Sequence, residues 1–191
     1  MMCDNANIIL SSGNTGESII NDIMRQMGLR YYHNLYVEDR SDNISQIDFL
    51  ALSNDTIVTL EVKNYNGCLI KGDSYSSYWT ACYTSKNKSF YNPLKQNEKH
   101  IQVLRSCINN NSMRIFNFVV FVSGCVLKIV EPLSWNERVL TTSDLWNELV
   151  SVNMIQNDRV PSDIVDVLDD FQSRTFELSD KHRKKYFYKK G

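Results

Sequence analysis

The 191-residue chain contains little cysteine, glycine or proline and has almost no net charge. Its five cysteines are widely scattered and form no C-x-x-C pair, which argues against both a disulfide framework and a structural zinc site. The 7 glycines and 3 prolines, with 42% hydrophobic and 23% charged residues, are typical of a folded chain and exclude a disordered one. We therefore expect reduced thiols, a cytoplasmic protein, and one domain, alone or with an appendage.

Long hydrophobic runs are also missing. The most apolar stretch, residues 115–130, is interrupted by polar residues and is shorter than the ~20 residues that span a bilayer. The first ten residues have neither the basic region nor the apolar core of a signal peptide. The net charge of −1 argues against a uniformly positive surface. We expect no membrane association, and any nucleic-acid surface must be local.

Hydrophobic periodicity and turn residues predict alternating helices and strands. Asn14 and Glu17 form a capping-box pattern before a stretch with helical spacing. Helices are expected over 15–27 and 93–109, and strands over 29–37, 44–52, 56–62, 115–122 and 127–130, with short pieces near 68–71 and 78–83. A polar link is expected before Pro93. The segment 135–171 is interpreted as a helical extension, whose helices begin at the caps Ser143 and Ser162.

The two strands over 44–52 and 56–62 are expected to form a hairpin. The residues between them, Ser53-Asn54-Asp55, include two types that tolerate the left-handed conformations of a tight turn. A two-residue turn at Asn54 and Asp55 would place Ser53 opposite Thr56. The numbers of facing residues then sum to 109 along the whole hairpin.

This register predicts a cluster of charged side chains on one face. It places Asp48 opposite Glu61, with Cβ atoms about 5 Å apart, and Gln46 opposite Lys63. Like charges at that distance destabilise a sheet, but a Mg²⁺ ion between them makes the arrangement favourable. Lys63 lies on the same face by strand alternation, where it can contact a phosphate or the attacking water. Two carboxylates with a lysine are typical of a phosphodiesterase, although Glu-x-Lys alone occurs by chance in many proteins.

Four motifs occur in the order that a known family has them. They are Gly13-x-x-Gly16-Glu17, then Gln46-Ile47-Asp48, then Glu61-Val62-Lys63-Asn64-Tyr65-x-Gly67, and finally Asn92-Pro93-Leu94-x-Gln96 followed by His100. Over about residues 11–130 the chain resembles the nuclease-related domain (NERD) family of the PD-(D/E)xK superfamily. Ile47-Asp48 stands where the superfamily has Pro-Asp.

The resemblance implies a fold and a set of site residues. It implies an α/β restriction-endonuclease-like core, with a central mixed β-sheet flanked by helices. Asp48, Glu61 and the carbonyl of Val62 would hold one or two Mg²⁺ ions, for which Mn²⁺ would substitute, and Glu17 would contribute directly or through water. Lys63 would be the catalytic lysine, and Gln96 would hold a water or a phosphate.

Several residues that could contact nucleic acid can also be interpreted as purely structural. Gln46 can orient water or phosphate, or be an ordinary polar strand residue. His100 lies one helical turn after Gln96 and faces either the substrate or the protein interior. The basic, aromatic tail over 181–190, with Lys184 and Lys185, suits phosphate contacts and stacking, or is a solvated terminus. An aromatic group over 75–83 is interpreted first as sheet packing.

We therefore expect a NERD-like nuclease domain over 11–130 and a helical C-terminal extension over 131–191. The leading hypothesis is Mg²⁺-dependent hydrolysis of DNA, in defence against foreign DNA or in DNA processing. The alternative is a noncatalytic module of the same fold that binds nucleic acid or a protein, the latter through the extension. The sequence leaves open a homodimer and the choice between single-stranded DNA, duplex DNA and RNA.

Overall fold

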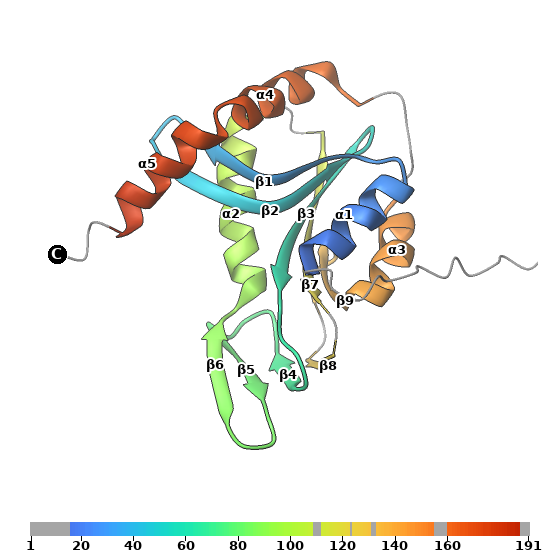
Figure 1. Cartoon of the computed structure of the whole chain (residues 1–191). Helices are drawn as coiled ribbons and strands as arrows, with labels where there is room; N and C mark the ends of the chain where they lie inside the picture. Colours follow the sequence, from blue (N-terminus) through green and yellow to red (C-terminus); the bar gives the residue numbers. More distant parts are fainter. Residues whose placement is uncertain (1–15, 109–111, 123, 131–132, 155–159, 188–191) are drawn as a thin grey trace, which may run out of the picture.

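The computed structural model describes residues 16–108, 112–122, 124–130, 133–154 and 160–187, in which two β-sheets are flanked by helices (Figure 1). The helices are α1 (Gly16–Gln26), α2 (Pro93–Cys107), α3 (Thr142–Ser151), α4 (Ser162–Ser173) and α5 (Thr175–Phe187). The strands are β1 (Arg30–Glu38), β2 (Ile44–Leu52), β3 (Thr56–Lys63), β4 (Leu69–Gly72), β5 (Tyr78–Cys82), β6 (Asn87–Tyr91), β7 (Arg114–Phe121), β8 (Val126–Ile129) and β9 (Glu137–Thr141). None of the described helices combines the length and hydrophobicity needed to cross a bilayer.

The larger sheet has the order β1-β2-β3-β7-β9. Strands β1, β2 and β3 pair antiparallel, and β7 and β9 continue from β3 in parallel, so the sheet is mixed as expected. The hairpin register is confirmed from the turn to Phe49, which faces Leu60. Ser53 donates its backbone N–H to the carbonyl of Thr56 at 2.9 Å and so closes the predicted turn.

The smaller sheet has the order β6-β5-β4-β8 and follows the C-terminal end of β3. Its inner face is apolar, with Ile70, Trp79 and Ala81 buried against Phe121 of β7. The rings of Trp79 and Phe121 stack with their centroids 6.3 Å apart. This packing holds the smaller sheet at the end of the larger one where β3 and β7 finish.

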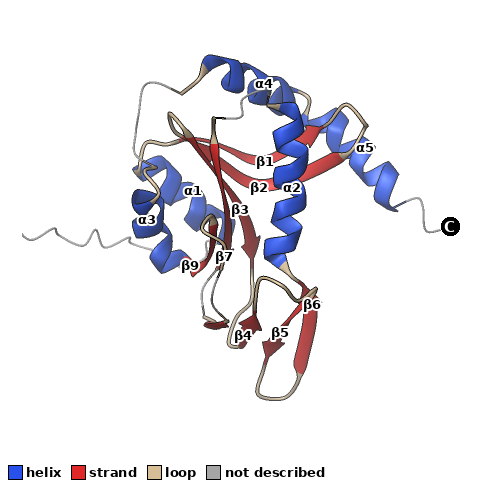
Figure 2. Ribbon diagram, turned by 180° about the vertical axis from the view of Figure 1, so that it is seen from behind, coloured by secondary structure: helices blue, strands red, loops and turns tan. Residues whose placement is uncertain are grey.

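Helices cover both faces of the larger sheet (Figure 2). On one face, α1 and α3 bury a core that includes Phe49, Leu60 and Phe118. On the other face, α2, α4 and α5 share a second core, to which α5 contributes Leu178. The alternation of strand residues therefore sends Phe49 and Leu60 towards α1, and Glu61 towards α2.

Some predicted elements were wrong. The expected polar link before Pro93 contains β6, and the segment expected to be helical from residue 135 contains β9, the outer strand of the larger sheet. Ser143 and Ser162 are not caps, since both lie inside helices whose N-caps are Thr141 and Pro161. The helical C-terminal region itself is confirmed by α3, α4 and α5. Asn14, the expected cap of α1, lies outside the described residues.

Candidate active site

The β2–β3 ladder stops before it reaches the charged residues. The last backbone pair is Phe49 with Leu60, and beyond it the Asp48 carboxylate accepts the backbone N–H of Val62 at 2.8 Å. The expected facing pairs, Asp48 with Glu61 and Gln46 with Lys63, are therefore wrong, because neither belongs to the ladder; Gln46 pairs with Tyr36 of β1. Because the N–H and C=O of one extended residue point to the same side, the Val62 carbonyl also faces the gap occupied by the Asp48 side chain.

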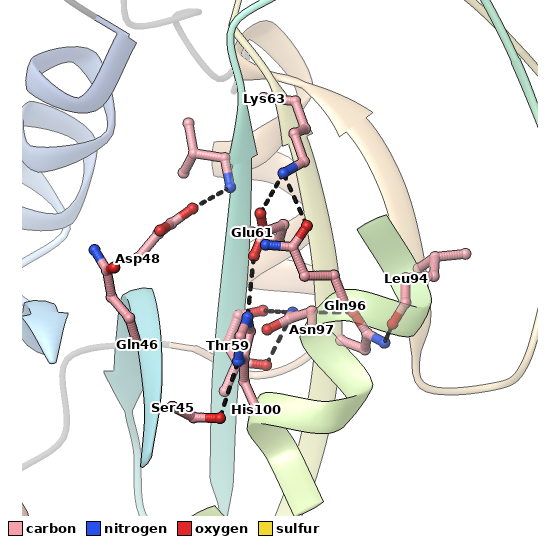
Figure 3. Close-up of polar contacts among 12 residues, drawn as sticks. Ser45, Gln46, Asp48, Thr59, Glu61, Lys63, Leu94, Gln96, Asn97 and His100 are labelled. Carbon is pink, nitrogen blue, oxygen red and sulfur yellow. Dashed lines mark hydrogen bonds and ion pairs between the residues drawn. The ribbon is translucent and has the colours of Figure 1, made fainter. Parts of the chain in front are cut away.

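Glu61 lies at the centre of a polar cluster between β3 and α2 (Figure 3). Its side chain is only 3% exposed, and Lys63 donates to one carboxylate oxygen at 2.5 Å. Lys63 also donates to Oε1 of Gln96 at 3.1 Å. On the other oxygen of Glu61, Nε2 of His100 approaches to 3.6 Å. The structure therefore joins Glu61, Lys63, Gln96 and His100 through direct contacts.

The other ring nitrogen of His100 also has a partner. Its Nδ1 lies 3.2 Å from Oγ of Ser45, a buried residue on β2. A helical residue with one ring nitrogen at Ser45 and the other at Glu61 has a fixed ring orientation. The sequence is compatible with His100 facing either the substrate or the interior, and the structure places it at the border of the cluster.

Two carboxylates share this buried region. Burial and, to a lesser extent, the neighbouring Glu61 carboxylate raise the pKa of Asp48 to about 6, while the Val62 N–H and the Lys63 charge oppose the rise. Without a cation beside it, the ionised form of Asp48 is therefore disfavoured. Such a perturbed acid, at the point where the β2–β3 ladder stops, is typical of a functional site.

Helix α2 is fixed on the sheet by buried amides. Asn97 donates from Nδ2 to the Thr59 carbonyl at 3.1 Å and to Oδ1 of Asn117 at 3.0 Å. At the start of the helix, the completely buried Asn92 accepts the backbone N–H of Leu94 at 2.9 Å, as expected for a cap. These bonds determine how far Gln96 projects towards Lys63.

Glu17 lies outside the direct contacts of the cluster. Its carboxylate is 54% exposed and lies 3.2 Å from Nε2 of His33 on β1. A Cβ on Gly16 would lie 2.3 Å from a methyl carbon of Val122, so glycine allows the start of α1 to approach the end of β7. This contact brings Glu17 to the sheet end where β3 also finishes.

A polar chain leads from Glu17 towards Asp48. Asn34 contacts the same nitrogen of His33 at 3.2 Å and accepts a bond from Gln46 at 3.0 Å. Asn34 has a φ of 53°, a left-handed conformation that is unusual within a strand, and its place in the register is opposite Asp48. Gln46 is thereby oriented by β1.

The two predicted lysines of the tail lie on α5 and face different partners. Lys184 pairs with Asp180 on its own helix at 2.6 Å, and its side chain is 68% exposed. Lys185 donates to the backbone carbonyl of Asp42 at 2.6 Å, in the turn between β1 and β2. The tail as far as residue 187 is part of α5. The bond from Lys185 holds this helix against the turn between β1 and β2.

The donor set suits a hard divalent cation. Asp48 and Glu61 supply carboxylate oxygens and Val62 a carbonyl, and Mg²⁺ binds through one or two carboxylates with water completing its shell. Within the described ranges no group of three or more His, Cys, Asp or Glu side chains surrounds one point. Lys63 pairs with Glu61 in this state. These residues therefore suit an ion that keeps several water molecules in its coordination shell.

Sequence reasoning missed the residues that support the cluster. Asn97 occupies a buried position in the apolar stripe of α2 with Leu94 and Ile101, and a polar residue in such a stripe was an available signal. Ser45 and His33 had none, since their roles depend on contacts with residues far away in the sequence. Of the aromatic group over 75–83, Trp79 is core, whereas Tyr75 and Tyr78 are exposed.

Comparisons with known proteins agree with the motifs. The chain is 29% identical over 153 residues to an uncharacterized protein of Bacillus anthracis. The aligned region covers 78% of this chain and 71% of that protein. A crystal structure of a protein of unknown function aligns over 88% of this chain and 95% of its own, at 10% identity and a TM-score of 0.34, too low to establish a shared topology. The model of the nuclease-related domain family matches residues 12–122. The chain belongs to the nuclease-related domain family.

Proposed function

We propose that this protein is a Mg²⁺-dependent nuclease that hydrolyses phosphodiester bonds of DNA. The observation that carries the proposal is the arrangement at the end of β3, where Glu61 and Lys63 contact each other and Asp48 approaches from β2. Membership of the nuclease-related domain family supports the same chemistry. The buried carboxylates raise the free energy of the folded protein when no cation is present, which a purely structural site would not require.

Each residue of the cluster would have its own role in hydrolysis. Asp48, Glu61 and the Val62 carbonyl would hold the cation, which when bound would neutralise charge on the phosphate and make a water molecule more acidic. Lys63 would exchange its contact with Glu61 for one with the phosphate or the attacking water, stabilising the negative charge that builds up there. Gln96 holds the Lys63 ammonium at 3.1 Å and so limits its direction.

Two further residues would act at the border of the cluster. His100 lies within 3.6 Å of Glu61, where it would orient that carboxylate or reach a neighbouring phosphate. Glu17 would approach the cation through water, since its direct contact in the structure is with His33. We assign Gln46 to orientation rather than to chemistry because its side chain bonds to Asn34.

The decisive assay follows cleavage of supercoiled plasmid and of a 5′-labelled single strand, in Mg²⁺, Mn²⁺ or EDTA. We expect cleavage by the wild type in either metal and none in EDTA. Glu61→Gln and Lys63→Met should each reduce the rate at least 100-fold, because each removes a charge from the reacting centre. An RNA of the same sequence tests the preference for DNA.

Matched controls remove the same charges elsewhere. Glu148→Gln takes away an ion-paired carboxylate on α3, and Lys71→Met takes away an exposed lysine on β4. Both should retain the wild-type rate. Equal rates for wild type, Glu61→Gln and Lys63→Met would overturn the assignment. If the protein binds DNA without metal and never cleaves it, the noncatalytic module is the correct interpretation.

A further inference from the structure

A pocket of about 440 Å³ opens between α2 and α5, beside the candidate active site. The residues that matter for its chemistry are Asn43, Ser45, Lys99, His100, His182 and Tyr186. Figures 1 and 2 both show α5 crossing the ends of β1 and β2, on the same side of the larger sheet as α2. This pocket, together with the part of α5 along its rim, is called the α2–α5 groove below.

The groove and the catalytic cluster share one residue. His100 lines the groove and also lies 3.6 Å from Glu61. The pocket extends from His100 to α5, since His182 and Tyr186 line it as well. Tyr36 of β1 also packs edge-on against His182 of α5, with ring centroids 5.7 Å apart. The groove therefore begins where the cluster ends.

The side chains of the groove combine cations with aromatic rings. Lys99 lies on one wall, with Nζ 4.7 Å from the ring centroid of Tyr91. On the other wall the rings of His182 and Tyr186 pack with centroids 4.8 Å apart, and Tyr186 remains 49% exposed. Lys185 is next to Tyr186 on α5, and its Nζ bonds to the carbonyl of Asp42, the residue before Asn43 of the pocket lining. The chain as a whole carries a charge of −1, so this concentration of cations is local.

The acid in the groove is already engaged. Asp39 accepts backbone N–H bonds from Ser41 at 2.8 Å and from Asn43 at 2.9 Å, and its second oxygen accepts the Asn43 side chain. These bonds hold the β1–β2 turn together. Asp39 keeps its negative charge, but both of its oxygens are held by the turn, and the positive charges available to an anion entering from solvent are those of Lys99 and Lys185.

We infer that the α2–α5 groove binds one strand of single-stranded DNA next to the phosphate that is cleaved. Lys99 and Lys185 contact successive phosphates, and an unstacked base packs on the exposed ring of Tyr186. A duplex keeps its bases stacked on each other and cannot offer one to this ring. The inference rests on the proposed function, which identifies the phosphate that is cleaved next to the groove.

Part of the groove lies outside the region that the family model matches. The family match ends at residue 122, and α5 begins at Thr175. One wall of the groove is therefore supplied by a segment outside the match. Lys184, on the same helix, pairs with Asp180 of α5, whereas Lys185 reaches the β1–β2 turn, so Lys184 serves as an internal control.

The test measures binding without cleavage. Fluorescence anisotropy in EDTA follows a labelled 12-nucleotide oligo(dT) and a duplex of the same length, using the full chain. Lys99→Gln/Lys185→Gln should weaken single-strand binding at least tenfold at 0.1 M salt. It should also lower the slope of log affinity against log salt by about 1.4, for two lost phosphate contacts. Lys184→Gln should stay within twofold of the wild type.

Tyr186→Ala separates stacking from charge. It should weaken binding of the single strand about tenfold and leave duplex binding within twofold. A second control, Lys71→Gln/Lys128→Gln, removes two lysines that face each other on the exposed face of the smaller sheet. All the changed side chains except that of Lys185 are exposed, and circular dichroism checks that each variant is folded.

The outcomes distinguish the groove from the nuclease activity. The groove assignment is overturned if the smaller-sheet control loses as much affinity as the groove variant, if Tyr186→Ala weakens both substrates equally, or if the wild type binds no single strand at micromolar concentration. If the binding pattern holds but no variant cleaves DNA, the groove stands and the nuclease assignment fails. If cleavage depends on Glu61 but the groove variants bind normally, the reverse conclusion follows.

Discussion

Replacing Asp48 with asparagine should make the metal-free protein more stable at pH 8. The folded protein holds the Asp48 proton more tightly than the unfolded chain does, because burial and Glu61 raise the pKa from its ordinary 3.8 to about 6. The unfolded chain therefore loses this proton first as the pH rises from about 4 to 6, and the free energy of unfolding falls over that range. Asparagine can still accept the Val62 N–H, so the substitution isolates the charge.

The size of the effect follows from the pKa. A rise from 3.8 to about 6 corresponds to about 3 kcal/mol, since each tenfold change in proton affinity is worth about 1.4 kcal/mol. Partial access of water reduces this to about 2–3 kcal/mol, or roughly 5–10 °C in Tm for a chain of this size. The gain should be nearly complete above pH 7 and nearly absent at pH 4.

Thermal and urea unfolding in EDTA at pH 4, 6 and 8 measure this difference. Asp166→Asn, an exposed change on α4, is the matched control and should change stability by less than about 0.5 kcal/mol at each pH. Adding Mg²⁺ at pH 8 should stabilise the wild type and not Asp48→Asn, since only the ionised carboxylate holds the cation. A variant that is less stable than the wild type at pH 8, or a difference that does not change with pH, would refute this reasoning.

Three further predictions concern the supports of the site. Gly16→Ala should lower the free energy of unfolding by about 1–3 kcal/mol because its Cβ would overlap Val122, and adding Val122→Ala should recover part of the loss in urea titrations. Asn97→Ala should cost about 2–3 kcal/mol because it removes an amide that donates to buried oxygens of Thr59 and Asn117, whereas the exposed Gln102→Ala should be neutral in the same titrations. Cys107 should resist iodoacetamide at pH 8 in the native protein and react after unfolding, because burial raises its pKa to about 11; rapid native alkylation, mapped by mass spectrometry, would contradict this.

The sequence predicted the elements whose signals are local. The hairpin register followed from the turn at Asn54 and Asp55, and the strand 44–52 was placed with its observed limits. The point where the ladder stops was not predictable, because there the Asp48 side chain takes the Val62 N–H that a backbone carbonyl would otherwise accept. A register rule contains no information about such a replacement.

The missed strands share a physical reason. Strand β6 is an edge strand whose first three residues are exposed, so Asn87, Lys88 and Ser89 show no buried alternation. Strand β9 is also at an edge and is short, with only Leu140 buried. Edge strands are held by backbone pairing with a neighbour that lies far away in the sequence. Composition alone made both segments look like loop or helix.

Helix α5 shows where a family resemblance also stops being informative. Its sequence is polar, and it is held on the sheet by the buried Leu178 and by bonds from Lys181 to Glu38 and from Lys185 to Asp42. Each of the two lysine bonds crosses 143 positions of the chain, so neither periodicity nor a motif of the matched region could place the helix. The candidate catalytic cluster lies within that region, whereas the wall that we propose selects a single strand lies outside it. Chains that share the cluster and lack a helix in this place should therefore keep the chemistry and lose the preference for unpaired DNA.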